Sequence, residues 1–236
     1  MPADRYGMEA RSAYIHVPFC RHRCGYCNFT LVSGRDAWIE RYLLNLKREL
    51  ALLKQPRQLD TLYIGGGTPT HLSSNQLDRL LEIVDEWLPR EPTSEFTIEA
   101  NPSDLKDHRK LDVIRQHGVN RMSLGVQSLQ PRKLDLLERD HTPREVHDVM
   151  NAIRPWLRIS LDLIFGTPEE TLDEWKSDIF EASLLPVDHV STYGLTIEKG
   201  TSFWKRKHEN SLVELDEDTS ASCYEYAIDR LSELGF

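Results

Sequence analysis

Three of the four cysteines in this 236-residue chain, Cys20, Cys24 and Cys27, lie close together on one short stretch. Their spacing is C-x3-C-x2-C, directly after the apolar run Ala13–Val17. Thiolates are the usual ligands of iron–sulfur clusters, and three of them leave one iron of a [4Fe-4S] cluster without a protein ligand. The remaining cysteine, Cys223, lies far along the chain. The pattern therefore predicts a [4Fe-4S] cluster with one open iron, which a substrate or cofactor could chelate, as at catalytic zinc sites with an open position.

A disulfide framework and a zinc site are the alternatives to a cluster. Disulfides need pairs of cysteines, and a triplet in a long chain with few cysteines does not suggest them. Zinc would need a fourth ligand such as His16 or His22, and the usual paired C-x2-C halves are missing. The cluster is therefore the favoured interpretation, and we expect the two histidines to pack around the site rather than to donate protons.

Strand-like and helix-like segments alternate along most of the chain. Short apolar runs predict six strands: Ala13–Val17, Thr61–Ile64, Phe96–Glu99, Arg121–Val126, Leu157–Phe165 and His189–Leu195. Apolar residues at spacings of three or four predict helices between them. These cover 36–55, 77–84 with a cap at Ser73 or Ser74, 105–117 ending at Gly118, 131–153 with a break near Thr142-Pro143, and 169–184. Such βα units, with apolar residues at successive strand positions, predict a parallel sheet buried on both faces, either closed or open.

The alternation stops after Gly200. Two further helices are predicted over 203–207 and 214–234. We expect residues 1–12 to form an N-terminal tail and 13–200 the main α/β unit. Residues 201–236 are then the start of a C-terminal region that is truncated in this sequence.

Charge and hydropathy argue against several classes of partner. The net charge is −9 and there is no long basic block, so neither nucleic acid nor an anionic membrane is expected as a partner. The basic clump 205–208 is interpreted as a solvated helix face. No run approaches the roughly 18 apolar residues of a membrane span, and residues 1–12 lack the apolar core of a secretion signal. An oxygen-sensitive cluster with free thiols fits a reducing compartment, so we expect a cytoplasmic protein.

Glycine and polar residues follow successive strands, at the ends where parallel barrels build their active sites. Gly65–Pro69 follows the second strand, Glu99 ends the third and Gln127 follows the fourth. Asp162 lies within the apolar fifth strand, where a carboxylate is costly to bury unless it is hydrogen-bonded. Its partner is either a buried arginine or a hydroxyl or amino group of a cofactor.

The cysteine motif, with Tyr26 directly before its last cysteine, resembles the signature of radical S-adenosylmethionine (SAM) enzymes. The run Tyr14-Ile-His-Val-Pro-Phe-Cys20, followed by Gly65-Gly-Gly-Thr-Pro-Thr70, is similar to the oxygen-independent coproporphyrinogen III oxidase group, which includes heme chaperones. The resemblance extends from about Tyr14 to Ile197. It implies a partial (β/α)6 barrel in which SAM chelates the open iron. It also implies reductive cleavage of SAM to a 5′-deoxyadenosyl radical, with an electron from a donor protein.

The resemblance also assigns site residues. Cys20, Cys24 and Cys27 match the cluster ligands, and no residue is assigned a catalytic role. The positions that match SAM contacts are Tyr14, Tyr26, Gly66, Gly67, Thr68, Glu99, Gln127, Arg139, Asp162 and Gly194.

Two departures from the oxidase pattern favour the heme-chaperone branch. Oxidase relatives carry a fourth cysteine two places after the third, where this chain has Phe29, and they have a longer extension than the 19 residues that precede Cys20. The resemblance then implies binding of heme or a porphyrin and delivery of heme to acceptor proteins, with heme contacts expected beyond Phe236. The alternatives are radical decarboxylation of coproporphyrinogen III in heme biosynthesis and a radical SAM reaction on another substrate.

Overall fold

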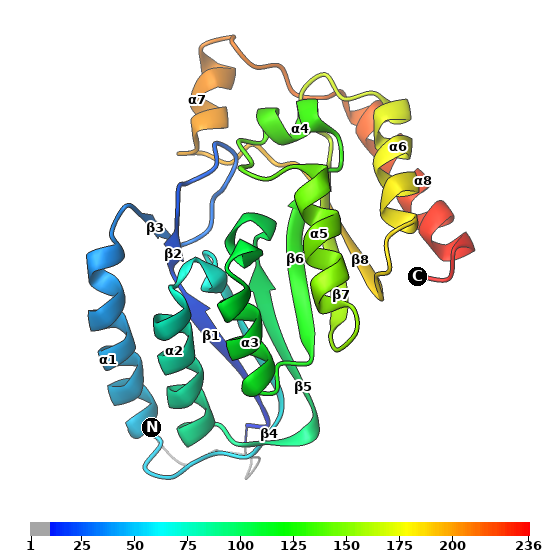
Figure 1. The fold of residues 1–236 in the computed structure, drawn as a ribbon. Coiled ribbons are helices and arrows are strands. Elements are labelled where there is room, and N and C mark those ends of the chain that lie inside the picture. The colour runs from blue at the N-terminus through cyan, green and yellow to red at the C-terminus, as the bar shows by residue number, and fades with distance from the viewer. Residues whose placement is uncertain (1–9) are drawn as a thin grey trace.

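Six parallel strands form a curved sheet in the computed structural model, which describes residues 10–236. In spatial order they are β1 (Ser12–Val17), β4 (Leu59–Gly66), β5 (Arg90–Ala100), β6 (Arg121–Gln127), β7 (Arg158–Phe165) and β8 (His189–Gly194). Because every neighbouring pair is parallel, all six carboxyl ends meet at one edge. Among the described residues β1 and β8 are the outer strands and do not pair with each other, so the sheet is a partial barrel, as predicted (Figure 1).

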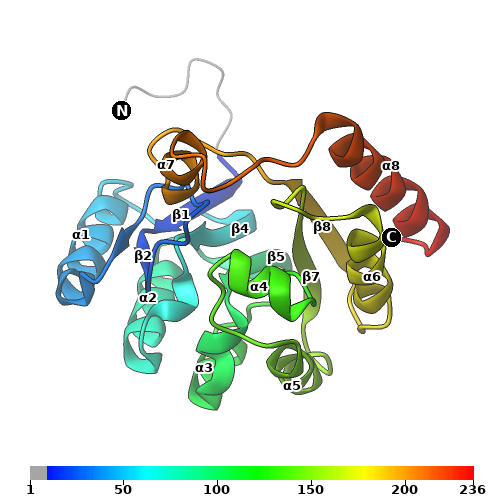
Figure 2. The same cartoon turned by 90° about the horizontal axis from the view of Figure 1, so that it is seen from above.

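Five helices line the outer, convex side of the sheet (Figure 2). They are α1 (Ile39–Ala51), α2 (Ser74–Trp87), α3 (His108–Gln116), α5 (Pro143–Ile153) and α6 (Leu172–Ser183). Three begin at capping boxes, in which the side chains of Ser73, Thr142 and Thr171 accept from a backbone N–H three residues later. Each helix buries one apolar stripe against the sheet, which is what the three- and four-residue spacing predicted.

Shorter elements connect these layers. They are the strands β2 (Phe19–Cys20) and β3 (Val32–Ser33), the 3-10 turns η1 (Asp36–Trp38), η2 (Pro69–His71) and η3 (Pro102–Lys106), and the helices α4 (Pro131–Leu136), α7 (Ser202–His208) and α8 (Glu217–Glu233). The predicted break near Thr142-Pro143 is confirmed by the gap between α4 and α5. The helix predicted over 105–117 is interrupted, because the Asp107 side chain caps α3 by accepting from the Arg109 N–H. Residues 1–9 of the predicted N-terminal tail lie outside the described residues.

Most of the sheet is buried on both faces, as predicted, but the two faces differ in polarity: Thr97 and Ser160 are fully buried on the concave side. Along β7 the residues buried against the helices are Ile159, Leu161 and Leu163. The residues that alternate with them, on the opposite face, are Arg158, Ser160 and Asp162. Alternation of this kind puts one apolar face against the helices and one polar face on the concave side. At the carboxyl edge this polar face borders a cavity that a ligand could enter.

A buried charge network fixes the loop that follows β6. Lys133 in α4 donates to Glu170 at 2.5 Å and to Asp178 at 3.0 Å, and all three side chains are almost fully buried. Asp178 also accepts from the Ser128 hydroxyl and, at 2.7 Å, from the Leu129 N–H. Breaking a buried pair by removing one partner is strongly destabilising, so these contacts hold α4 and the end of β6 firmly against α6.

Cys223 lies in α8, away from the other cysteines. It is fully buried, and its backbone carbonyl accepts from the Trp175 indole at 2.8 Å, which joins α8 to α6. From residue 10 onward, no helix has the length and apolar character needed to cross a membrane.

Candidate cluster and cofactor site

The cysteine loop runs between β2 and β3 and is tied down at several points. Cys20 ends β2, and the Cys27 N–H donates to the Cys24 carbonyl at 2.9 Å, which closes a turn around the motif. The Arg23 side chain donates to the carbonyls of Cys27, Phe29 and Leu31 at 3.4, 3.3 and 2.9 Å. A residue inside the motif thus holds the loop in shape, and the three thiols are left directed to one cavity.

This cavity, of about 470 Å³, lies at the carboxyl edge of the sheet. The three cysteines line it together with residues from the ends of β4 to β8. Nine of the ten residues predicted to contact SAM are among its lining residues: Tyr26, Gly66, Gly67, Thr68, Glu99, Gln127, Arg139, Asp162 and Gly194. Residues far apart in sequence therefore converge on one space, which is typical of a ligand site in a parallel barrel.

Tyr14, the tenth, lies outside the lining of the cavity. It faces the concave side, is 54% exposed, and its ring stacks on Tyr63 at 5.8 Å between centroids. Its hydroxyl lies 3.2 Å from Nδ1 of His16.

The two histidines near the motif are held by backbone carbonyls. His16 Nε2 lies 2.7 Å from the Thr30 carbonyl oxygen, and His22 Nε2 lies 2.7 Å from that of Glu138. Both therefore orient the cysteine loop, as expected for histidines that pack around the site. His22 also reaches Cys24, with Nε2 at 3.4 Å from Sγ.

The glycines at the end of β4 allow the backbone to lie close to His16 and Phe19. Gly66 has φ of +121°, which side chains rarely adopt, and a Cβ there would lie 2.6 Å from the His16 ring. A Cβ on Gly67 would lie 2.6 Å from the Phe19 carbonyl oxygen. The adjoining Thr68 hydroxyl lies 2.9 Å from Cys20 Sγ. The glycine run therefore lets β4 lie directly against the cysteine loop.

Arg139 is a buried arginine at the wall of the cavity and not a solvated helical one. It follows α4, and its guanidinium donates to Asn101 Oδ1 at 2.5 Å and to the Gly125 carbonyl at 2.9 Å. It also lies 3.7 Å from Cys24 Sγ. Its Nε is buried and has no hydrogen-bond partner within the described residues. Such an orphaned donor beside the thiols suits a ligand with acceptor atoms.

Two carboxylates provide the negative charge of the cavity. Glu99 accepts from the Tyr63 hydroxyl at 2.8 Å and from the Gly66 N–H at 2.9 Å. Burial raises the pKa of Asp162 to about 6, although hydrogen bonds from Ser123, at 2.8 and 3.0 Å, oppose the shift. A buried carboxylate with a raised pKa and only hydroxyl donors would gain from a cationic or hydroxyl-bearing ligand.

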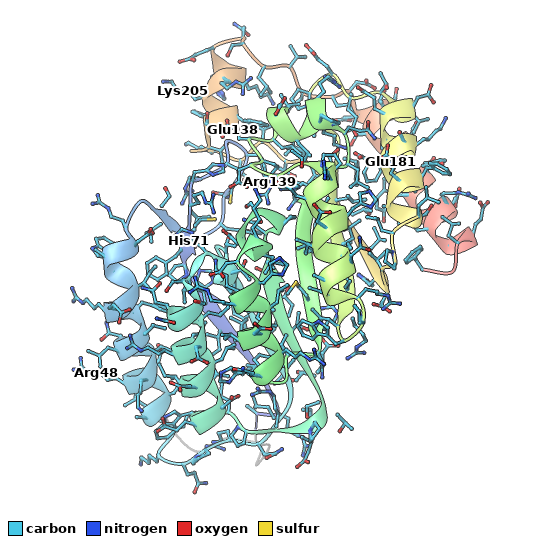
Figure 3. All side chains as sticks on the ribbon, viewed as in Figure 1. Arg48, His71, Glu138, Arg139, Glu181 and Lys205 are labelled. Carbon is cyan, nitrogen blue, oxygen red and sulfur yellow. The ribbon has the colours of Figure 1, made fainter. Side chains whose placement is uncertain are left out.

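Sequence reasoning missed Glu138, which clamps the cysteine loop from above. Its carboxylate accepts from the Gly25 N–H at 2.7 Å, and it lies beside Arg139 beneath α7 (Figure 3). The Phe203 N–H of α7 donates to the Gly25 carbonyl at 2.8 Å, and its ring packs edge-on against Tyr26. Glu138 has φ of +55°, uncommon for a residue other than glycine, and no sequence signal marks that conformation.

The donor set fits an iron–sulfur cluster. Burial raises the pKa of Cys20 and Cys24, and the Arg139 guanidinium opposes that shift at both thiols. Over residues 10–236, no three or more His, Cys, Asp or Glu side chains converge closely enough to hold a single metal ion. A cluster presents its irons at separate corners, so its thiolates need not meet at one point. The three thiols, which share one cavity, fit such a cluster.

Comparison with known proteins identifies the family. The profile of the radical SAM superfamily matches residues 14–182. The chain is 39% identical over 230 residues to the heme chaperone HemW of Lactococcus lactis, covering 97% of this chain and 60% of that protein. It is 37% identical to HemW of Bacillus subtilis, covering 95% of this chain and 61% of that protein.

A solved structure shows the same relationship. The coproporphyrinogen III oxidase HemN from Escherichia coli, a radical SAM enzyme, superimposes with a TM-score of 0.83 at 26% identity. The match covers 94% of this chain and 52% of that one. The chain thus spans about 60% of the length of its chaperone relatives and about half of HemN. It belongs to the radical SAM superfamily.

Proposed function

We propose that this chain is the cluster- and SAM-binding unit of a heme chaperone. Membership of the superfamily implies a [4Fe-4S] cluster and SAM. The observation that carries the proposal is the single cavity that three thiols share with nine residues matching SAM contacts. Similarity to HemW proteins at 37–39% identity supports a chaperone over an oxidase. Phe29 supports it too, since it lines the cavity and is 67% exposed where the oxidase pattern has a fourth cysteine.

In this proposal the chain's own residues bind and orient the cofactors. Cys20, Cys24 and Cys27 would hold the cluster through their thiolates. When bound, the cluster and SAM supply one-electron reductive cleavage of the sulfonium. Asp162 and Glu99 accept from amino and hydroxyl groups of SAM, and Arg139 donates to its acceptor atoms. The glycines 66 and 67 allow the backbone to lie against the ligand, and Tyr26 and Phe203 shield the loop from water. Gln127, Thr68 and Gly194 complete the contact set; Tyr14 stays a predicted contact.

The proposal extends to partners and location. The protein would bind heme or a porphyrin, receive electrons from a donor protein and pass heme to acceptor proteins. Its four free cysteines support a reducing, cytoplasmic location. We also propose that residues 13–200 are the barrel unit and that 201–236 belong to a C-terminal region, whose helix α8 packs on α6.

The second candidate is coproporphyrinogen III oxidation, favoured by the TM-score of 0.83 with HemN. The test is to reconstitute the protein anaerobically and to incubate it with coproporphyrinogen III, SAM and a reductant, while heme binding is titrated in parallel by absorbance. We expect heme binding when the region expected beyond Phe236 is present, poor heme binding by residues 1–236 alone, and no product above a cluster-free control. Sustained formation of protoporphyrinogen would overturn the chaperone proposal in favour of the oxidase.

A further inference from the structure

The concave face of the sheet continues below the cavity, toward the amino ends of the strands. Strand register aligns one row of residues across it: Tyr14, Tyr63, Thr97, Arg121 and Arg158. Two stacked tyrosines form one end of the row and two arginines the other. The arginines are direct partners on neighbouring strands, which lie roughly 4.8 Å apart.

Nothing in the described part of the chain neutralises these two arginines by contact. Arg121 makes a single long hydrogen bond, 3.5 Å to the Thr97 hydroxyl, and Arg158 is exposed and has no side-chain partner. Like charges directly opposite each other destabilise a sheet. Two acids lie near Arg121 without forming a salt bridge to it: Glu95 accepts at 3.1 Å from the Thr97 hydroxyl that Arg121 also contacts, and Asp162 accepts from Ser123. Two adjacent arginines without a salt bridge to any described residue, in a chain of net charge −9, point to an anionic ligand.

The distance from the pair to the cavity suits a large ligand. Arg121 precedes Gly125, which lines the cavity, by four residues on the same strand. Four strand residues span about 13 Å. A flat macrocycle carrying carboxylates on its edge could lie over the tyrosines, with one edge at the cavity and its acidic side chains at the arginines.

We propose that Arg121 and Arg158 bind a propionate carboxylate of a tetrapyrrole that lies on the concave face. This inference rests on the proposed function, which supplies the ligand class. Guanidinium groups match carboxylates in a bidentate fork, and two of them side by side would lose their mutual repulsion on binding an anion. Tyr14 on β1 and Tyr193 on β8 are 54% and 55% exposed on the concave side, and Arg158 is exposed as well, so these side chains are accessible to such a ligand.

The test compares coproporphyrin III with its tetramethyl ester, which has the same ring and no carboxylates. Equilibrium dialysis against the cluster-reconstituted protein measures both affinities. We expect the acid to bind about tenfold more tightly or better, and Arg121→Gln and Arg158→Gln each to lower only the acid affinity by about tenfold. Arg158→Lys should fall between Arg158→Gln and the native protein. Arg144→Gln, which removes an exposed charge from α5 on the outer side, should change neither affinity.

A second readout does not depend on the ligand. Because the pair is repulsive without an anion, Arg158→Gln should melt at or above the temperature of the native protein. Three results would each overturn the inference. They are equal affinity for coproporphyrin III and its ester, no binding of either, and a preference for the acid that is retained when both arginines are replaced by Gln. The two proposals can fail independently. If the native protein and the Arg→Gln variants bind heme equally well, only this inference is contradicted. If the native protein prefers the acid to the ester but also turns over coproporphyrinogen III, only the chaperone proposal is contradicted.

Discussion

Replacing Asp162 with asparagine is expected to stabilise the ligand-free protein at neutral pH while weakening SAM binding. Burial raises the pKa of Asp162 from 3.8 to about 6. A pKa that is about 2 units higher in the folded than in the unfolded state means that ionised Asp162 destabilises the fold by about 3 kcal/mol at pH values above 6. Asparagine carries no charge and keeps an acceptor for the Ser123 hydroxyl. Its amide N–H needs a partner of its own, so we expect a net gain of about 1–2 kcal/mol.

The pH dependence has a defined sign. Between the unfolded pKa of 3.8 and the folded pKa of about 6, the folded state binds more protons at Asp162 than the unfolded state. The contribution of this group to stability therefore falls as pH rises through that window and is constant above it. The stability of the Asp162→Asn protein lacks this pH-dependent decrease. Its free energy of unfolding should therefore exceed that of the native protein by more near pH 7.5 than near pH 5.

Urea unfolding of the ligand-free protein at the two pH values measures the stability difference. Anaerobic calorimetric titration of the cluster-loaded protein measures SAM affinity, which should fall about 10- to 100-fold with the lost charged acceptor. Asp178→Asn is the matched control, because its carboxylate pairs with Lys133 at 3.0 Å and its loss should destabilise the fold. An Asp162→Asn protein less stable than the native one near pH 7.5, or one with unchanged SAM affinity, would refute the reasoning.

Two further predictions concern the frame around the site. Lys133→Met leaves the buried carboxylates of Glu170 and Asp178 without their cation, so the free energy of unfolding measured in urea should fall by about 3–5 kcal/mol. A fall of less than about 1 kcal/mol would contradict the assigned network. Glu138→Ala removes the acceptor of the Gly25 N–H, so a chelator should strip iron from the reconstituted protein about tenfold faster. Glu169→Ala, at a side chain 85% exposed, serves as its control, and equal stripping rates would exclude the clamp.

The local patterns predicted the frame well because they report short-range physics. All six predicted strands are present, and Ser73 caps α2 as expected. The cysteine spacing and the glycine run pointed to residues that line one cavity. The strand patterns predicted burial but not the polarity of the concave face: Ser160 is fully buried and lies on that face with Asp162.

The parts that could not be predicted depend on contacts between distant segments. Arg139 is anchored by Asn101 and by Gly125, which sequence spacing does not bring together. Gln127 has φ of +68° at a register shift between β6 and β7, and no residue type signals that bulge. Tyr14 faces the concave side but is not among the residues that line the cavity, so its contact with the cofactor stays a prediction. Such features depend on the tertiary structure and on the pairing register of the strands, which the sequence does not specify locally.

The central claim is that Cys20, Cys24 and Cys27 hold one [4Fe-4S] cluster whose open iron binds SAM. The most direct measurement is the EPR spectrum of the reduced, anaerobically reconstituted protein with and without SAM. We predict a cluster signal that SAM shifts, that each of the three Cys→Ala changes abolishes, and that Cys223→Ala leaves intact. A cluster signal that SAM leaves unchanged at saturation, or that disappears with Cys223, would contradict the account.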